Sequence, residues 1–128
     1  MVWTKLVDWT GGAIWRGAVL RFPAHSPYES IVDLLVFDPT DHGRSLGLMV
    51  DSGYKAGLTL VLLPKESAGA YDGHRICPDW LVSNWSTWVY PKTPVEQVFI
   101  SPGRPIPRLP LQKARKTLDR SFSPSREV

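Results

Sequence analysis

The sequence has few of the residues from which metal, redox or disulfide chemistry is built. Its 128 residues include one cysteine, Cys77, and three histidines. A single cysteine cannot form an internal disulfide, and it cannot supply a cysteine-rich zinc site. We therefore expect a protein of a reducing compartment that holds no metal ion and no cofactor.

Long apolar runs are also lacking. No uninterrupted apolar run exceeds four residues, as in 60–63, whereas a membrane-spanning helix needs about 20. The start of the chain has no apolar stretch of signal-peptide length. These absences predict a cytoplasmic protein that does not enter a membrane.

Positive charge is scarce up to residue 100 and abundant after it. Residues 1–100 hold eight Lys and Arg against ten Asp and Glu, a net charge of −2, and residues 101–128 hold seven against two, a net charge of +5. Prolines 102, 105, 107 and 110 favour an extended linker. We predict a folded domain over 1–100 and a Pro-rich, basic extension over 101–128. Apolar residues then recur at helical spacing at positions 111, 114, 118 and 122, which predicts a basic amphipathic helix.

Within residues 1–100 the pattern predicts an α+β fold. Residues 31–37 and 58–63 are almost entirely apolar, as expected of strands at the centre of a sheet. Further strands are expected at 13–22, broken by Gly17, and at 46–51 and 95–100, with turns at 38–43 and 52–57. A helix should begin at Pro78. The predicted architecture is a mainly antiparallel sheet of about five strands with one packed helix.

Six tryptophans are the most distinctive content of the sequence, in two groups at positions 3, 9, 15 and 80, 85, 88. Tryptophan builds either dense core or binding surface. Leu81, Trp85 and Trp88 follow one face of the predicted helix, and Trp80 lies off it. We assign Trp9, Trp15, Trp85 and Trp88 to the core and expect Trp80 to be partly exposed.

The sequence offers no defensible catalytic constellation. Asp38, Asp41 and His42 could bind a metal or move a proton, but their spacing matches no ligand pattern, and such residues usually shape turns. No G-x-S-x-G motif is present. We therefore expect a protein without enzymatic activity. A hydrolase using Asp41 and His42 is the weakest alternative. A nucleic-acid-binding module using the basic extension is stronger, although the tryptophans lie in the acidic part.

Three blocks together resemble a known family. They are W-T-G-G-A-I-W-R-G-A-V-L-R-F (9–22), D-S-G-Y-K-A-G-L (51–58) followed by L-P-K-E (63–66), and W-L-V-S-N-W-S-T-W-V-Y (80–90). In this order they resemble the immunity protein 45 family of bacterial polymorphic toxin systems, over about residues 3–100. The resemblance implies a small, non-enzymatic protein that binds and neutralises a toxin encoded next to it. It implies no catalytic residues.

A cytoplasmic inhibitor implies a toxin that acts in the cytosol. If that toxin is a nuclease, its cleft is basic, and an acidic patch on the inhibitor would complement it. An exposed tyrosine in a turn could anchor the contact. The alternative is that the acids only shape turns and the tyrosine lies flat on the core. The predicted toxin-binding residues are Asp38, Asp41, His42, Asp51, Tyr54 and Lys55.

Overall fold

Six antiparallel strands form one sheet in the computed structural model of the chain, which describes residues 1–71 and 73–110. The strands are β1 (Thr4–Lys5), β2 (Val19–Pro23), β3 (Ile31–Phe37), β4 (Arg44–Val50), β5 (Thr59–Pro64) and β6 (Phe99–Ser101). Their order across the sheet is β1-β6-β2-β3-β4-β5. The predicted α+β class is confirmed. The sheet has one strand more than expected because β1 is too short to leave a sequence pattern.

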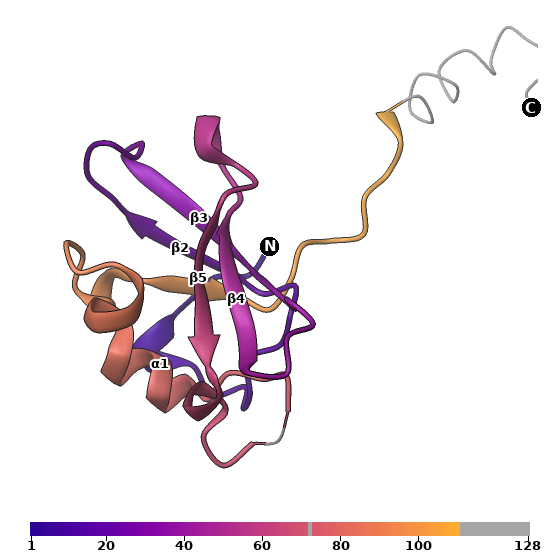
Figure 1. Cartoon of the computed structure of the whole chain (residues 1–128). Coiled ribbons are helices and arrows are strands. Elements are labelled where there is room, and N and C mark those ends of the chain that lie inside the picture. Colours follow the sequence, from indigo (N-terminus) through magenta and orange to yellow (C-terminus); the bar gives the residue numbers. More distant parts are fainter. Residues whose placement is uncertain (72, 111–128) are drawn as a thin grey trace, which may run out of the picture.

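Strands β2 to β5 form a meander in which each strand pairs with the next (Figure 1). The apolar strand β3 lies inside the sheet as predicted, but β5, which was expected there, is an edge strand. Its apolar residues serve two faces. Leu63 is buried in the core, while Leu62 packs with Phe37 over the Cα atom of Gly47 on the other face. The apolar run of β5 therefore reflects contacts on both faces of the sheet, and it does not indicate a position at the centre of the sheet.

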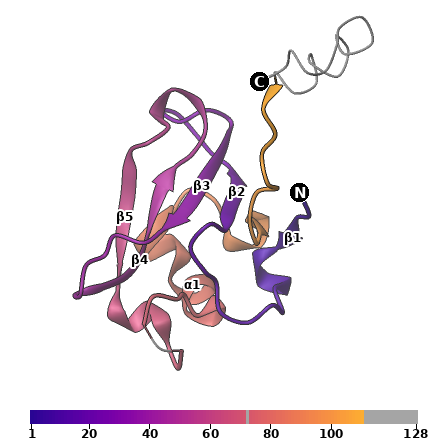
Figure 2. The same cartoon turned by 90° about the vertical axis from the view of Figure 1, so that its right-hand side faces the viewer.

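One helical layer covers one face of the sheet (Figures 1 and 2). Helix α1 (Pro78–Asn84) begins with a proline at a position where no backbone donor is needed, and one turn of π-helix (Trp85–Val89) continues it. The π turn closes with a hydrogen bond from the Tyr90 N–H to the Trp85 carbonyl oxygen, 3.0 Å. Short 3₁₀ turns occur at Leu6–Asp8, Gly53–Lys55, Lys65–Ala68 and Val95–Gln97.

The π turn changes which helical side chains face the core. A π turn is closed by a hydrogen bond between residues five apart, so it is wider than an α-helical turn. The buried face predicted from α-helical spacing therefore shifts by one residue. Trp85 and Val89 are buried, and Trp88 is only half-buried. The Trp88 ring lies 6.0 Å from the ring of Trp80, which is likewise half-buried. The expected partial exposure of Trp80 is confirmed, and the predicted core position of Trp88 is only partly right.

Trp85 is at the centre of the core, 1% exposed. Its ring meets Phe22 edge-on at 5.2 Å, and Phe22 lies 5.1 Å from Tyr90. The indole N–H donates to the Thr93 carbonyl oxygen at 3.1 Å, so the one polar atom of the side chain has a partner.

Two predicted strands are shorter in the structure than in the sequence pattern. Gly17, at φ +95°, separates β2 from Ile14, which instead forms an isolated bridge with Ile76. The predicted strand 95–100 begins with a 3₁₀ turn at Val95–Gln97, after which β6 continues to Ser101. The regular strand pairing is interrupted at Gly17 by its positive φ, and before β6 by the 3₁₀ turn that follows Pro94.

The predicted position of Trp15 is wrong. It was assigned to the core but is 49% exposed. The segment before Gly17 leaves the sheet, so only Ala13 and Ile14 turn inward. Trp9, by contrast, packs partly buried against the core, and its indole N–H donates to the Gly12 carbonyl oxygen at 2.9 Å.

Residues 102–109 leave the sheet in an extended conformation that includes three of the expected prolines, at 102, 105 and 107 (Figure 1). The predicted amphipathic helix, at 111–122, lies outside the described residues.

The Gly69→Ala substitution should destabilise the fold. Gly69 ends the turn after β5 at φ +59° and ψ −129°, and an added Cβ would lie 2.8 Å from the Cβ of Cys77. We expect a loss of about 3 kcal/mol in the free energy of unfolding, from backbone strain plus the clash, measured by urea denaturation. Gly57→Ala is the matched control, because Gly57 has φ +95° but open space around it. An equal loss in both variants would show that the clash with Cys77 contributes nothing.

Candidate functional site

Among residues 1–71 and 73–110, the only helical layer packs on one face of the sheet, and we call the other face the open face. Registered neighbours on β2, β3 and β4 place Val19, Leu35 and Met49 on it, and Arg21 and Asp33 beside them. The alternate residues of the same strands belong to the core cluster. Alternation along the strands therefore separates a packed face from a face available for contacts.

One end of the sheet carries a group of exposed apolar side chains. Tyr54 is 70% exposed, and Ile31 and Leu58 are each 58% exposed. The β2–β3 and β4–β5 connections lie together at this end (Figure 1), and the Tyr54 hydroxyl donates to the Pro27 carbonyl oxygen at 2.6 Å. We call the group of Ile31, Tyr54, Lys55 and Leu58 the tyrosine end.

The tyrosine end is held in place by the core beneath it. The Lys55 ammonium lies 5.2 Å from the centre of the Tyr54 ring and 5.7 Å from that of Tyr28. Tyr28 in turn meets Tyr90 edge-on at 6.0 Å, and Tyr90 is buried. These contacts join an exposed aromatic side chain to a rigid scaffold, the arrangement typical of interface anchors.

A carboxylate buried in the sheet lies next to the tyrosine end. Asp33 is 5% exposed, and Arg21 donates to both of its oxygens, Nε to Oδ1 at 2.7 Å and Nη2 to Oδ2 at 2.8 Å. Arg21 also stacks over the Trp3 ring at 4.2 Å. The hydrogen bonds to Asp33 raise the pKa of the Arg21 guanidinium above its ordinary value. The pair is a fixed, bidentate ion pair.

Asp51, one of the predicted site residues, adjoins this pair. Its backbone N–H donates to the Asp33 carbonyl oxygen at 2.8 Å. Its carboxylate accepts hydrogen bonds from Arg104 of the C-terminal linker, from Nε at 3.1 Å and from Nη2. Arg104 Nη2 is also 3.6 Å from Asp33 Oδ2. The acidic group near Tyr54 is thus occupied by a guanidinium of the same chain.

The carboxylates of Asp38 and Asp41, at the β3–β4 turn, accept hydrogen bonds from backbone N–H groups of the same turn. Asp38 Oδ1 accepts from the Thr40 N–H at 2.7 Å and lies 3.3 Å from His74 Nδ1. Asp41 Oδ1 accepts from the Gly43 N–H at 2.8 Å. These contacts are those of turn-forming residues, the alternative role considered for them.

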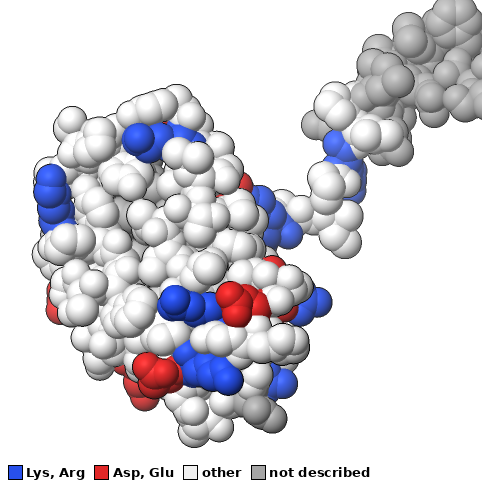
Figure 3. Space-filling view, in the orientation of Figure 1, with Lys and Arg blue, Asp and Glu red and all other residues white. Residues whose placement is uncertain are grey.

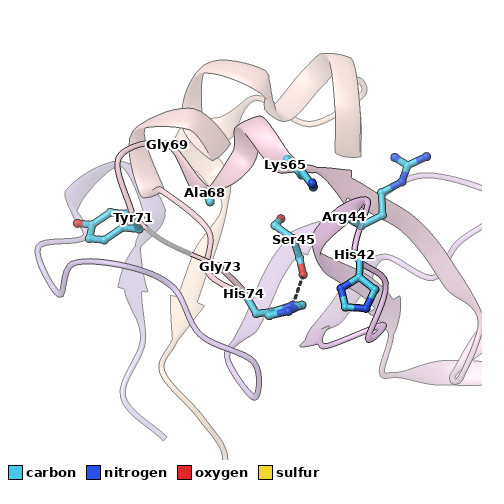
Figure 4. A pocket seen from close by; sticks show the side chains of 9 residues that line it. All are labelled: His42, Arg44, Ser45, Lys65, Ala68, Gly69, Tyr71, Gly73 and His74. Carbon is cyan, nitrogen blue, oxygen red and sulfur yellow. Dashed lines mark hydrogen bonds between the residues drawn. The ribbon is translucent and has the colours of Figure 1, made fainter.

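A hollow of about 350 Å³ opens beside this turn (Figure 4). Its walls include two exposed cations, Arg44 and Lys65, and two histidines, His42 and His74, the latter 3.1 Å from the Ser45 carbonyl oxygen. Acidic and basic side chains are therefore mixed around the β3–β4 turn.

The predicted site residues do not form one patch. Asp38, Asp41 and His42 lie at one end of β4, and Asp51, Tyr54 and Lys55 at the other. The seven residues of β4 separate them, a distance of about 20 Å in an extended strand. The structure brings the second group together with Ile31 and Leu58 and leaves the first group apart.

Figure 3 shows how charge is distributed on one face of the molecule. Acidic and basic side chains are mixed over its lower part, near α1 and the β3–β4 turn, and the upper part has a wide uncharged area between basic spots at the top, at the left edge and on the right, where acidic atoms adjoin the basic ones beside the linker. Contact with the upper part would therefore depend on apolar side chains more than on an acidic field.

A second surface was missed because Trp15 was assigned to the core. Trp15 borders a small apolar hollow of about 180 Å³, whose walls also include Trp9, Ala18 and Pro102. The Arg75 guanidinium lies 4.2 Å above the Trp15 ring. A half-exposed tryptophan stacked on arginine beside an apolar hollow is also suited to protein contact.

Within residues 1–71 and 73–110, no helix has both the length and the apolar character to cross a membrane. In the same part of the chain, no three His, Cys, Asp or Glu side chains gather closely enough to hold a metal ion.

Comparison of the sequence with models of known protein families shows which family the chain belongs to. The model of the immunity protein 45 family matches residues 6–100, which is more than half of the chain. The chain belongs to the immunity protein 45 family. This confirms the resemblance found in the three sequence blocks. No curated protein and no solved structure matches the chain. Membership of an immunity protein family implies a toxin-neutralising role and a cognate toxin as partner.

Sequence reasoning also missed the ion pairs of this immunity protein. Asp33 is the one acid inside the apolar strand β3, and Arg21 the one base inside β2. Opposite charges placed alone in adjacent strands predict a cross-strand pair. The sequence therefore contained a signal for the Arg21–Asp33 pair, but the register of β2 and β3 was needed to show that the two residues lie opposite each other. The contact of Arg104 had no sequence signal, because it depends on the path of the linker.

Proposed function

We propose that this protein binds a cytosol-acting toxin encoded next to it and occludes the toxin's active site, with the tyrosine end in the contact and without turnover. Family membership supports the toxin as partner. The exposure of Tyr54, Ile31 and Leu58 on a rigid support is the observation that selects the tyrosine end. Exposed apolar groups of this kind mark interaction surfaces.

The chemistry of the tyrosine end suits an inhibitor. An aromatic anchor loses little conformational freedom on binding, and Tyr54 already has a hydrogen bond from its hydroxyl to the backbone of the neighbouring turn. Asp51 and Lys55 supply charges of both signs at its rim, which can fix the orientation of a partner. A nuclease with a basic cleft remains a suitable toxin, approached through the Asp33 and Asp51 carboxylates.

Co-expression with the neighbouring gene tests the function. The toxin alone should stop growth, and this protein should restore growth and co-purify with the toxin. In solution, inhibition should be complete at one equivalent and should not increase with incubation time. A harmless neighbour, or the lack of a complex, would show the proposal to be wrong. Inactivation by much less than one equivalent would instead indicate an enzyme.

The β3–β4 turn is the second predicted contact region, and Asp41→Lys tests it. Reversal of this charge should raise the Kd of the toxin complex at least about fivefold if a basic toxin surface reaches the turn. The melting temperature should fall only slightly, because the residue is exposed and supports one turn hydrogen bond. Affinity measured by titration calorimetry decides the question. An unchanged Kd would remove Asp41 from the interface and leave the tyrosine end as the contact.

A further inference from the structure

The start of the C-terminal linker lies across the open face. Val19 and Ser101 are neighbours on β2 and β6, and both are buried, 0% and 1% exposed, although α1 packs on the opposite face. Val19 is not part of the core cluster. Gly103 lies close to the Gly17 carbonyl oxygen, 3.8 Å from the position of a Cβ. We call residues 102–104 the strap.

Arg104 fastens the strap to the sheet. Its guanidinium binds the Asp51 carboxylate, approaches Asp33 Oδ2 at 3.6 Å and contacts the sulfur of Met1 at 3.9 Å. Both views show the linker running beside the N-terminal segment (Figures 1 and 2). After Arg104 the side chains turn to solvent, with Ile106 91% and Leu109 65% exposed.

The carboxylates under Arg104 form a prepared receptor for a guanidinium. Asp33 is held from below by the bidentate contact with Arg21, and Asp51 is positioned by its backbone bond to β3. With Arg104 in place, two carboxylates balance two guanidinium groups. Without it, the same site has a net charge of −1. The receptor adjoins the tyrosine end through the β4–β5 turn, which begins at Asp51.

The hold on Arg104 is suited to exchange. Its side chain is 45% exposed, and that of Asp51 is 28% exposed. Ion pairs at such exposure stabilise by about 1 kcal/mol or less, because water and salt screen them. The side chain of a partner that buries the site on binding would gain more from the same carboxylates.

We propose that the strap is an internal competitor for the toxin: Arg104 occupies, in the free protein, the carboxylate pair that an arginine or lysine of the toxin takes in the complex. The proposal rests on the proposed function and extends it by naming the chemistry of the partner residue.

A double-mutant cycle on Arg104 and Asp51 tests the exchange, with the neighbouring toxin as the probe and calorimetric Kd values as the readout. R104Q should lower the Kd about fivefold, since it removes a competing contact worth about 1 kcal/mol. In D51N, the R104Q change should have no further effect. In R104Q, the D51N change should raise the Kd at least tenfold. R108Q is the matched control, because Arg108 is an exposed arginine of the same linker, and it should leave the Kd unchanged.

The outcomes separate this proposal from the proposed function. Wild-type protein that binds no toxin would overturn the function and the strap proposal together. Wild-type protein that binds, with R104Q unchanged or weaker, would overturn the strap proposal alone. Equal gains for R104Q and R108Q would show a general charge effect and would also overturn it. Melting temperatures that fall by no more than about 6 °C in R104Q and D51N, the shift that loss of a contact worth about 1 kcal/mol produces in a domain of this size, would show that the Kd values report binding.

Discussion

Tyr54→Ala should raise the Kd of the toxin complex about 30-fold or more. Tyr54 is 70% exposed and stands at the centre of the tyrosine end, and aromatic residues in such positions contribute 2 kcal/mol or more to binding when they are buried by a partner. The melting temperature should change by no more than about 2 °C, because the side chain contributes little to the core and its hydroxyl has a single bond, to Pro27. Calorimetry and thermal unfolding measure the two effects separately.

Two control variants make this prediction specific. Tyr54→Phe removes only the hydroxyl that donates to Pro27, so it should keep most of the affinity. Tyr71→Ala removes a tyrosine that is 37% exposed and lines the hollow beside the β3–β4 turn, so it should leave the Kd unchanged if the tyrosine end is the contact. An unaffected Kd for Tyr54→Ala, or a larger effect at Tyr71, would move the interface away from the tyrosine end.

Local patterns predicted those parts of the fold that depend on local interactions. The apolar run of β3, the two turns that flank β4 and the proline start of α1 are all present in the structure. Strand order was not accessible, since β5 has the composition of an inner strand and lies at the edge. The position of Trp88 was misjudged because a π turn has no signature in the spacing of apolar residues.

The candidate site was predicted only in part, for a physical reason. Loop composition identified Asp51, Tyr54 and Lys55, which do lie together, but it could not show that Asp38 and Asp41 are at the other end of β4. It also could not show that their carboxylates are used within the turn. Which surface a loop joins depends on strand order and register, and these are set by packing across the whole sheet.

Trp85→Ala should be the most destabilising single substitution among the tryptophans, at about 3–5 kcal/mol of unfolding free energy. The side chain is 1% exposed, meets Phe22 edge-on and bonds to the Thr93 carbonyl oxygen. Its removal leaves a large cavity and an acceptor without its donor. Trp15→Ala is the matched control, because Trp15 is 49% exposed, and it should cost about 1 kcal/mol or less. Urea denaturation gives both values, and similar losses would contradict the placement of the two side chains.

The same pair of variants separates loss of folding from loss of contact in cells. Trp85→Ala should weaken protection against the toxin by lowering the fraction of folded protein, so protection should return at lower growth temperature or higher expression. Tyr54→Ala should weaken protection at an unchanged folded fraction, because it changes affinity and not stability. Trp15→Ala should leave folding nearly intact, so any loss of protection it causes would place the Trp9 and Trp15 hollow in the interface as well. Protection that fails in Trp85→Ala even when the folded fraction is restored would contradict the purely structural role that the 1% exposure of Trp85 indicates.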